Sequence, residues 1–495
     1  MNTFYHSTRS NEQLVTSKQA ILTGIAPDGG LYVCDDITSH QLDLNTICNQ
    51  TFMETSRLVL STLLDDYTSE EIAACVEEAY GSSFDTPAIT PVTPLGNDWL
   101  LELYHGPTCA FKDVALQMLP RLMSKAHAQS DQNIMIVTAT SGDTGKAALA
   151  GFAGVPGTGI CVFYPEGKVS DVQRLQMVTQ TGSNVEVCAV SGNFDDVQTE
   201  VKHIFADKNL AGRLHTSNIA LSSANSINIG RLVPQVVYYF DAYAQLVRSG
   251  ALQKGESVEF CVPTGNFGDV LAGYYAKLMG LPVARLVVAS NSNDVLCDFI
   301  ESGVYDRRRP FYTTISPSMD ILVSSNLERL LYLLSDGDCE LIASLMKQLS
   351  EEGHYTVPRS LHERIRETFS YGHATDEETS KAIRTTWEQD HVLIDTHTAV
   401  AKHVLAQQQP SDAAARVCLS TASPFKFPAD VLAALGEDIT GLDGFTCMDR
   451  LSELTGAQAP RQLSELRDAE VIRNASCDVS GMSEIVENAC MRCLA

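Results

Sequence analysis

The sequence has few basic residues and no long apolar run. It carries 35 Lys and Arg against 61 Asp and Glu, a formal net charge of -26 at pH 7. Nucleic acids and anionic membrane surfaces repel so acidic a chain, so we expect neither as a partner. No apolar run approaches the ~20 residues that span a bilayer, and the first twenty residues lack the apolar stretch of a secretory signal. With 44 % hydrophobic residues in 495, a large buried core is possible.

Cysteine is present but not dense. The 14 cysteines are scattered, mostly within apolar segments, where Cys behaves as a small apolar residue. A disulfide scaffold would be shorter and richer in Cys. Cys490 and Cys493 form a C-x-x-C pair, but no second pair or His cluster follows it, so the sequence favours a reduced, exposed tail over a zinc site. We therefore predict no metal and a reducing, cytoplasmic compartment.

Strand-like and helical segments alternate through the middle of the chain. Short β-branched runs occupy residues 133–140, 159–165, 185–190, 258–264 and 284–290. Helical spacing between several of them indicates βαβ units, and hence an α/β fold with mostly parallel sheets flanked by helices. Ligands bind such sheets at the carboxyl ends of the strands.

The sequence also suggests a division of the chain. A small helical N-terminal region comes first, then an α/β core of two lobes, then a helical insertion or lobe, and last a return to the core with a helical tail. These parts are predicted at residues 1–95, 96–300, 301–405 and 406–495. The return rests on the strand-like run at 415–421.

Three loops that follow strand-like runs carry chemistry. The first, at 138–147, contains Gly145-Lys146 but has Thr140 and Ala147 where a nucleotide P-loop needs Gly and Ser or Thr. A hydroxyl-rich turn at a helix N-terminus can still hold a carboxylate or phosphate. An ordinary capped turn between strand and helix is the alternative.

The second loop, at 263–269, has two glycines before a helix, which suits a phosphate. It does not fit G-x-G-x-x-G, so NAD is disfavoured. The third, at 105–113, places Lys112 at a helix start. A surface lysine is the alternative there, but Phe111 and the Gly106-Pro107 turn suggest a partly buried amine, which would form a Schiff base more readily. An imine-forming lysine, a phosphate loop and a carboxylate loop together indicate a pyridoxal phosphate (PLP) enzyme acting on an amino acid.

Five motifs in order resemble the threonine synthase family. They are HGPTCAFKD, TATSGDTGKAA, PTGNFGDVLAGYYA, TISPSMDILVSSNLERL and LSTASPFKFP, and the likeness runs from about residue 3 to about residue 430. The resemblance implies the tryptophan-synthase-β-like PLP fold type II. It also implies the conversion of O-phospho-L-homoserine and water to L-threonine and phosphate. The sequence departs from the family at Cys109, Ser423 and Phe425, where Leu, His and Ala are common.

The resemblance assigns roles to residues by motif. Lys112 would hold the cofactor covalently, and Thr421 would face its pyridine nitrogen. The cofactor-binding loop would comprise Gly265, Asn266, Phe267, Gly268 and Asp269. The substrate carboxylate would meet Ser141, Asp143 and Thr144, and the substrate phosphate would meet Asn225, Ser226 and Arg231. For Arg231 alone, a surface salt bridge is the alternative.

Other functions remain open at this point. A PLP-dependent phospholyase acting on O-phosphohomoserine or O-phosphothreonine would release 2-oxobutyrate, ammonia and phosphate with the same residues. A silent amino-acid or phosphate-binding protein would not need an imine-forming lysine, and a kinase fails the P-loop spacing. We expect a small-molecule substrate and a monomer or homodimer.

Overall fold

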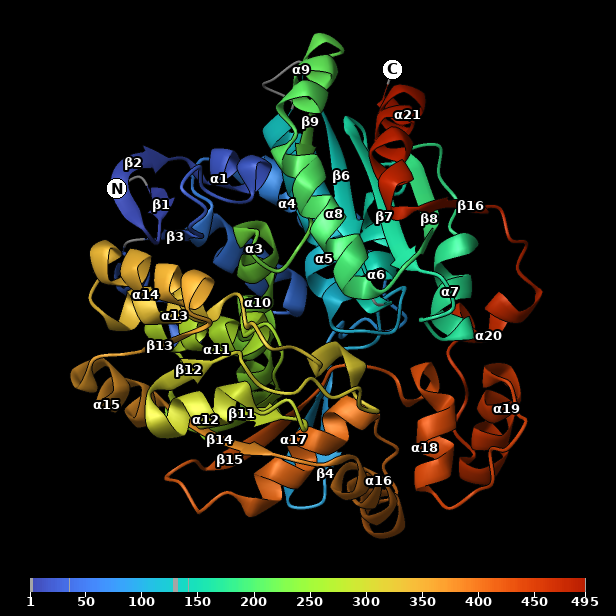
Figure 1. Cartoon of the computed structure of the whole chain (residues 1–495). Helices are drawn as coiled ribbons and strands as arrows, with labels where there is room; N and C mark the ends of the chain where they lie inside the picture. The colour runs from blue at the N-terminus through green and yellow to red at the C-terminus, as the bar shows by residue number, and fades with distance from the viewer. Residues whose placement is uncertain (1–2, 35, 128–131, 141, 495) are drawn as a thin grey trace.

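The computed structural model describes residues 3–34, 36–127, 132–140 and 142–494. Figure 1 shows two large sheets with helices around them. The first sheet has the strand order β14-β11-β10-β15-β5-β4, parallel except for β4, which pairs antiparallel with β5. Its strands are β4 (Val92–Leu95), β5 (Asp98–Glu102), β10 (Val258–Pro263), β11 (Val283–Ser290), β14 (Phe369–His373) and β15 (Ala415–Ser420).

The second sheet is parallel throughout, in the order β16-β8-β7-β6-β9. Its strands are β6 (Asn133–Ala139), β7 (Thr158–Pro165), β8 (Val185–Ser191), β9 (Ile219–Ser222) and β16 (Ala475–Asp478). The strand-like runs predicted from the sequence are therefore strands. Every residue of β7 and of β10 is buried, as expected for parallel strands covered on both faces.

Helices cover both faces of each sheet. Successive residues of β10 show this, because Phe260 and Val262 belong to one apolar cluster while Cys261 belongs to another. Around the first sheet lie α10 (Ile229–Arg248), α11 (Gly268–Leu278) and α17 (Thr396–Gln407). Against the second lie α6 (Asp143–Phe152), α8 (Phe194–Ala206), α9 (Lys208–Thr216) and α21 (Met482–Leu494), while α5 (Lys112–His127) and α7 (Asp171–Val178) pack on α6. In the described ranges, no helix is both long and apolar enough to cross a membrane.

The N-terminal region contains a small sheet as well as the helices that the sequence predicts. Strands β1 (Tyr5–Ser7), β2 (Ser10–Val15) and β3 (Tyr32–Cys34) form an antiparallel sheet in the order β2-β1-β3. Helices α1 (Ser17–Thr23), α2 (Leu44–Cys48), α3 (Phe52–Leu63) and α4 (Ser69–Tyr80) accompany it. Thr16, Thr51 and Thr68 begin α1, α3 and α4 with capping boxes. The sequence did not predict these short strands, because helical patterns dominate this region.

The segment expected to be a helical insertion is mostly helical. After the last residues of α12 (Val295–Ser302), it contains α13 (Leu327–Leu334), α14 (Cys339–Glu351), α15 (Arg359–Thr368), α16 (Asp376–Asp390) and most of α17. A small pair of strands, β12 (Val304–Asp306) and β13 (His354–Thr356), lies among them. The segment at 301–405 also contributes β14 to the edge of the first sheet, and the sequence did not predict this strand. The division of the chain into four parts stays a prediction.

The C-terminal segment is not an exposed tail. After α18 (Pro428–Ala434), α19 (Gly444–Thr455) and α20 (Arg461–Ser464), β16 joins the second sheet and α21 packs against it. Cys490 is fully buried and Cys493 is half-buried, so the expectation of exposure is wrong for Cys490. The physical reason is an apolar stripe at helical spacing, formed by Met482, Val486, Ala489 and Cys490.

Candidate active site

The predicted site residues follow strands of both sheets. Lys112 begins α5 after β5, and Asp143 begins α6 after β6 of the second sheet. The loop of Gly265 lies between β10 and α11, and Thr421 follows β15 directly. Lys112 Nζ and Asp143 Oδ2 are 3.6 Å apart, so the carboxyl ends of the two sheets meet at one place.

The Lys112 amine is buried, with the residue 8 % exposed, which excludes a surface lysine. It donates to Ser318 Oγ at 3.4 Å and lies 4.7 Å from the centre of the Phe111 ring. Burial lowers the pKa of Lys112; Asp143 opposes this effect, and the positive charges of Lys426 and Arg231 add to it. The amine therefore loses its proton more readily than an ordinary lysine.

Asp143 lies between two lysines. Lys426 Nζ is 3.1 Å from Asp143 Oδ1, which also accepts a hydrogen bond from Gln173 Nε2 at 3.0 Å. Burial acts to raise the pKa of Asp143, but the charges of Lys426 and Lys112 outweigh it and hold that pKa well below its usual range. The carboxylate is therefore ionised. Thr144 is half-buried in the first turn of α6, and Ser141 lies outside the described residues.

Lys426 is a site residue that sequence reasoning missed. Its side chain is completely buried, and Nζ donates to the carbonyl oxygen of Thr108 at 2.8 Å. The signal was present, because Lys426 belongs to the motif LSTASPFKFP. In the same segment Thr421 is 5 % exposed, and its carbonyl accepts a hydrogen bond from the Phe111 N–H at 2.8 Å. Thr421 therefore lies beside the start of α5.

Ser318 and His397 were also missed. The Ser318 hydroxyl donates to Asp143 Oδ2 at 2.9 Å, and the Ser318 N–H donates to His397 Nε2 at 3.1 Å. On its other side, His397 Nδ1 lies 2.7 Å from Asp395 Oδ2. A backbone N–H only donates, so Nε2 accepts and the proton of a neutral ring resides on Nδ1. These residues come from segments some 80 positions apart, so no local pattern joins them.

The loop at 265–269 leaves little space for side chains. A Cβ on Gly265 would lie 2.9 Å from the carbonyl oxygen of Ser318, closer than real Cβ contacts allow. Phe267, with φ of 61°, turns the chain into α11, which begins at Gly268. Ser324 Oγ donates to the carbonyl oxygen of Gly265 at 2.7 Å, and Asn266 contributes its own carbonyl to Asn326. The first N–H groups of α11 are thereby brought next to a tightly held turn, a suitable place for a phosphate.

Asp269, in the first turn of α11, is buried. Its Oδ1 accepts hydrogen bonds from the hydroxyls of Tyr238 and Tyr239, at 2.5 and 2.9 Å. Burial raises the pKa of Asp269 to about 6, while the two tyrosines and Lys112 act in the opposite direction. Since Lys112 affects this pKa, Asp269 belongs to the same electrostatic surroundings as the amine.

Arg231 is buried rather than paired at the surface. It is 5 % exposed, and Nη1 donates to the carbonyl oxygen of Ala224 at 3.0 Å. Across the described part of the chain, no group hydrogen-bonds Nε, and burial lowers the pKa of Arg231 to about 10. Asn225 and Ser226 are half-buried nearby in sequence; Asn225 Oδ1 accepts from Thr138 Oγ1 at 3.2 Å. A buried guanidinium with an unused donor fits an anion.

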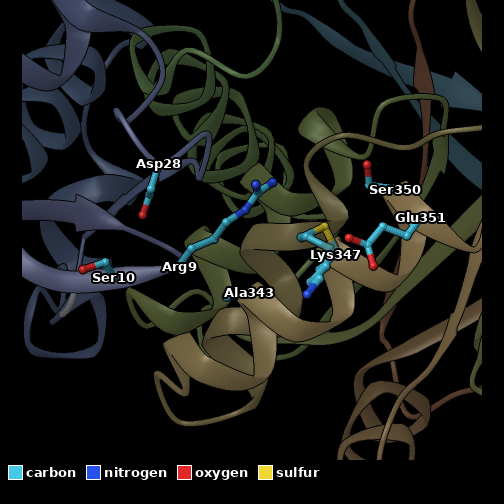
Figure 2. A pocket seen from close by; sticks show the side chains of 8 residues that line it. Arg9, Ser10, Asp28, Ala343, Lys347, Ser350 and Glu351 are labelled. Atoms are coloured by element: carbon cyan, nitrogen blue, oxygen red, sulfur yellow. The ribbon is translucent and has the colours of Figure 1, made fainter.

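These residues fit PLP. The cofactor needs an amine for its aldehyde and donors for its phosphate, and the site holds the Lys112 amine and the glycine turn at the start of α11. The surface hollow in Figure 2 is a different place, lined by Arg9, Ser10, Asp28, Ala343, Met346, Lys347, Ser350 and Glu351. It contains none of the residues predicted for the site.

Comparison with known families covers most of the chain. Residues 4–80 match the threonine synthase N terminus, residues 90–421 match the pyridoxal-phosphate-dependent enzymes, and residues 398–475 match the threonine synthase C-terminal family. The first match ends shortly before the second begins, and the second and third overlap at residues 398–421.

Comparison with individual proteins leads to the same family. The chain is 39 % identical over 430 residues to threonine synthase of Pseudomonas aeruginosa, covering 86 % of this chain and 89 % of that one. Human threonine synthase-like 1 is 39 % identical over 439 residues; the match covers 86 % of this chain, which spans only 59 % of that relative's length.

A crystal structure of PLP-bound threonine synthase from Brucella melitensis superimposes with a TM-score of 0.88 at 37 % identity, covering 99 % of both chains. Together, the buried lysine site, the family matches and this superposition place the chain in the threonine synthase family, with PLP fold type II and PLP as its cofactor.

Proposed function

We propose that this protein converts O-phospho-L-homoserine and water to L-threonine and phosphate, as a carbon–oxygen lyase acting on a phosphate. The observation that carries the proposal is that the site holds two buried cationic side chains: the Lys112 amine, and Arg231, whose Nε has no partner among the described residues and whose charge acts on the pKa of Lys112. An amine that forms imines and a guanidinium that binds phosphate are what this substrate requires.

Lys112 would hold the cofactor, and the turn from Gly265 to Asp269 would receive its phosphate at the start of α11. Thr421 would face the pyridine nitrogen with a neutral hydroxyl. When bound, PLP supplies an electron sink that stabilises negative charge at the substrate Cα.

Arg231, Asn225 and Ser226 would bind the substrate phosphate. During the reaction a proton leaves Cβ, the electron pair of that C–H bond forms a Cβ–Cγ double bond, and the bond between Cγ and the phosphate oxygen breaks with both of its electrons leaving on the phosphate. Cγ then gains a proton, and Cβ gains the hydroxyl of water. A guanidinium already buried and oriented stabilises that growing charge without reorganising solvent. The retained phosphate would then lie near the Cβ to which the oxygen of water is added.

Lys112 Nζ would accept the proton from the substrate Cα, since burial lowers its pKa and increases its uncharged fraction. Asp143 is ionised and lies between Lys112 and Lys426, so it would repel a substrate carboxylate. We assign Asp143 to holding the two lysines, and Thr144 and Ser141 to the substrate carboxylate. Ser318 would keep the Lys112 amine oriented through its hydrogen bond.

Product analysis tests this proposal. The purified protein is incubated with PLP and O-phospho-L-homoserine, and the carbon product is identified by mass. Threonine with one equivalent of phosphate is the expected outcome. A product of 2-oxobutyrate and ammonia would replace the proposed function with the phospholyase, while keeping the roles of Lys112 and Arg231.

We place the reaction in the cytoplasm, because the 14 cysteines are scattered through the chain, mostly within apolar segments, and are not grouped as in a disulfide scaffold. A monomer or homodimer is the expected assembly, and size-exclusion chromatography with light scattering distinguishes these two states.

A further inference from the structure

Asn326 occupies the position before α13 but does not cap that helix. An Asn there commonly accepts a hydrogen bond from an N–H of the first turn. Within the described stretch 142–494, the Asn326 side chain makes no such bond, although the residue is completely buried. Its amide serves other parts of the fold instead.

The amide joins the two loops that we assign to phosphate groups. Asn326 Nδ2 donates to the carbonyl oxygen of Ser226 at 3.1 Å and to that of Asn266 at 3.1 Å. The Asn326 N–H donates to the same Asn266 oxygen at 3.1 Å. Ser226 belongs to the loop after β9, and Asn266 belongs to the loop after β10. One side chain therefore bridges two loops that come from different sheets.

Arg329, one turn further along α13, determines which way the amide points. Arg329 is completely buried, and its Nη1 donates to Asn326 Oδ1. A guanidinium only donates, so the amide oxygen faces Arg329 and the amide nitrogen faces the two carbonyls. The same guanidinium donates from Nη2 to the Ile227 carbonyl at 2.6 Å and from Nε to the Tyr32 carbonyl at 2.8 Å. Its planar shape fixes all three directions.

We propose that Asn326, oriented by Arg329, is a positioning residue that sets the separation of the two phosphate-binding loops. The proposal rests on the proposed function, which gives one loop to the cofactor phosphate and the other to the substrate phosphate. Two neighbouring phosphates repel each other, so the protein must hold their loops at a set distance. That distance also decides where the leaving group lies relative to the reacting carbons, and small errors there are costly.

Substitutions at Asn326 separate this role from folding. In Asn326→Asp a carboxylate oxygen still faces Arg329, so the buried guanidinium keeps its partner, but the two hydrogen bonds that the side-chain amide donates to the loops are lost, and only the backbone N–H still donates to Asn266. Asn326→Ala removes the same donors without adding charge. Glu328→Gln is the matched control on the same helix, because Glu328 bonds to Arg9 and Thr8 of the N-terminal region.

Three quantities are measured on each variant. The affinity for PLP is obtained by titrating PLP-free protein, and the affinity for inorganic phosphate by calorimetry on the PLP-loaded protein. KM and kcat with O-phospho-L-homoserine are measured separately. We expect both Asn326 variants to weaken PLP and inorganic phosphate binding by about tenfold, and to raise KM more than they lower kcat. Glu328→Gln should lower only the melting temperature.

Affinities within twofold of the wild type in the Asn326 variants would overturn the proposal, as would equal losses in Glu328→Gln. If Asn326→Ala does not fold, Asn326→Asp decides, since it keeps the contact to Arg329. If the wild type forms no threonine but the Asn326 variants still lose affinity for PLP and phosphate, the proposed function fails and the role of Asn326 stands.

Discussion

Lys112 shares one carboxylate with a second lysine. Asp143 Oδ2 lies 3.6 Å from Lys112 Nζ, and Asp143 Oδ1 lies 3.1 Å from Lys426 Nζ. Burial and the second positive charge favour the uncharged form of Lys112, whereas Asp143 favours the charged form. This residue-scale balance prepares the amine to accept a proton.

Replacing Lys112 by Ala should remove both the covalent site for PLP and the group that accepts the Cα proton. We expect kcat to fall by roughly 10³-fold or more, the order of magnitude of general base catalysis. Borohydride reduction followed by peptide mass analysis should find PLP on the peptide of Lys112 in the wild type only. Lys168→Ala, at an exposed position after β7, is the control. Wild-type turnover in Lys112→Ala would refute the assignment.

Asp269 gives a pH-dependent prediction. Burial raises its pKa from 3.8 to about 6. A raised pKa stabilises the folded state at low pH, and this stabilisation is lost as pH rises through about 6. Asp269→Asn removes the titration. In PLP-free protein, its free energy of unfolding relative to the wild type should therefore increase by about 2 kcal/mol between pH 4.5 and pH 7. Chemical denaturation at both pH values measures this; a constant difference would contradict it.

Two elements that are far apart in the chain, the short turn η2 (Pro317–Met319) and α17, are joined by a hydrogen bond at the site. The turn η2 carries Ser318, and the first turn of α17 carries His397, which accepts the Ser318 N–H. Asp395, the N-cap of α17, holds the His397 ring. The orientation of the Ser318 hydroxyl next to Lys112 thus depends on a helix from another part of the chain.

His397→Ala should remove the acceptor of the Ser318 N–H in the turn η2. We expect kcat to fall about tenfold with little change in KM, because Ser318 orients the Lys112 amine rather than binding substrate. His397→Gln, which offers an amide oxygen in place of Nε2, should recover part of the loss. His403→Ala on the same helix is the control, since that side chain bonds to Gln407. Equal kcat losses in His397→Gln and His397→Ala would argue against orientation by hydrogen bonding.

Helix α21 closes one face of the second sheet. Val486→Ala removes two buried methyl groups from this contact and should lower the free energy of unfolding by about 1–2 kcal/mol. It should also speed the labelling of Cys490 by a thiol reagent, followed by peptide mass analysis, because local opening of α21 exposes that thiol. Asn488→Ala, on the exposed side of the helix, should change neither quantity. An unchanged Cys490 labelling rate in Val486→Ala would contradict this packing.

On the scale of the whole molecule, the site joins the two large sheets. Lys112, the Gly265 loop and Thr421 follow strands of the first sheet, whereas Asp143 and Arg231 begin helices that follow strands of the second. A ligand that contacts both groups should therefore stabilise both sheets together.

Calorimetry of the PLP-free and PLP-loaded protein tests this. Binding to the folded state alone stabilises it by about 2.7 kcal/mol at a ligand concentration 100 times Kd. We expect PLP to move one unfolding transition to higher temperature, with a smaller shift in Lys112→Ala. Two transitions, of which one is insensitive to PLP, would contradict a site shared by both sheets.

The strands and the three loops were predictable because their signals are local. The run at 258–264, for example, is apolar throughout since both of its faces are covered, and the glycines that follow it signal a turn at a helix start. The resemblance added the family and the candidate roles. The burial of Lys112 also followed from its neighbours Gly106, Pro107 and Phe111.

Only the tertiary structure decided which distant residues meet Lys112. Ser318, His397 and Lys426 reach the site from segments about 200 to 300 positions away, and single-sequence patterns carry no information on such contacts. The burial of Cys490 and the pairing of β14 and β16 likewise depend on which surface each segment covers. The sequence by itself determined the local elements and the family, because these depend on near neighbours and motifs. The protonation of the site depends on burial and on charges from distant segments, both of which arise only when the chain folds.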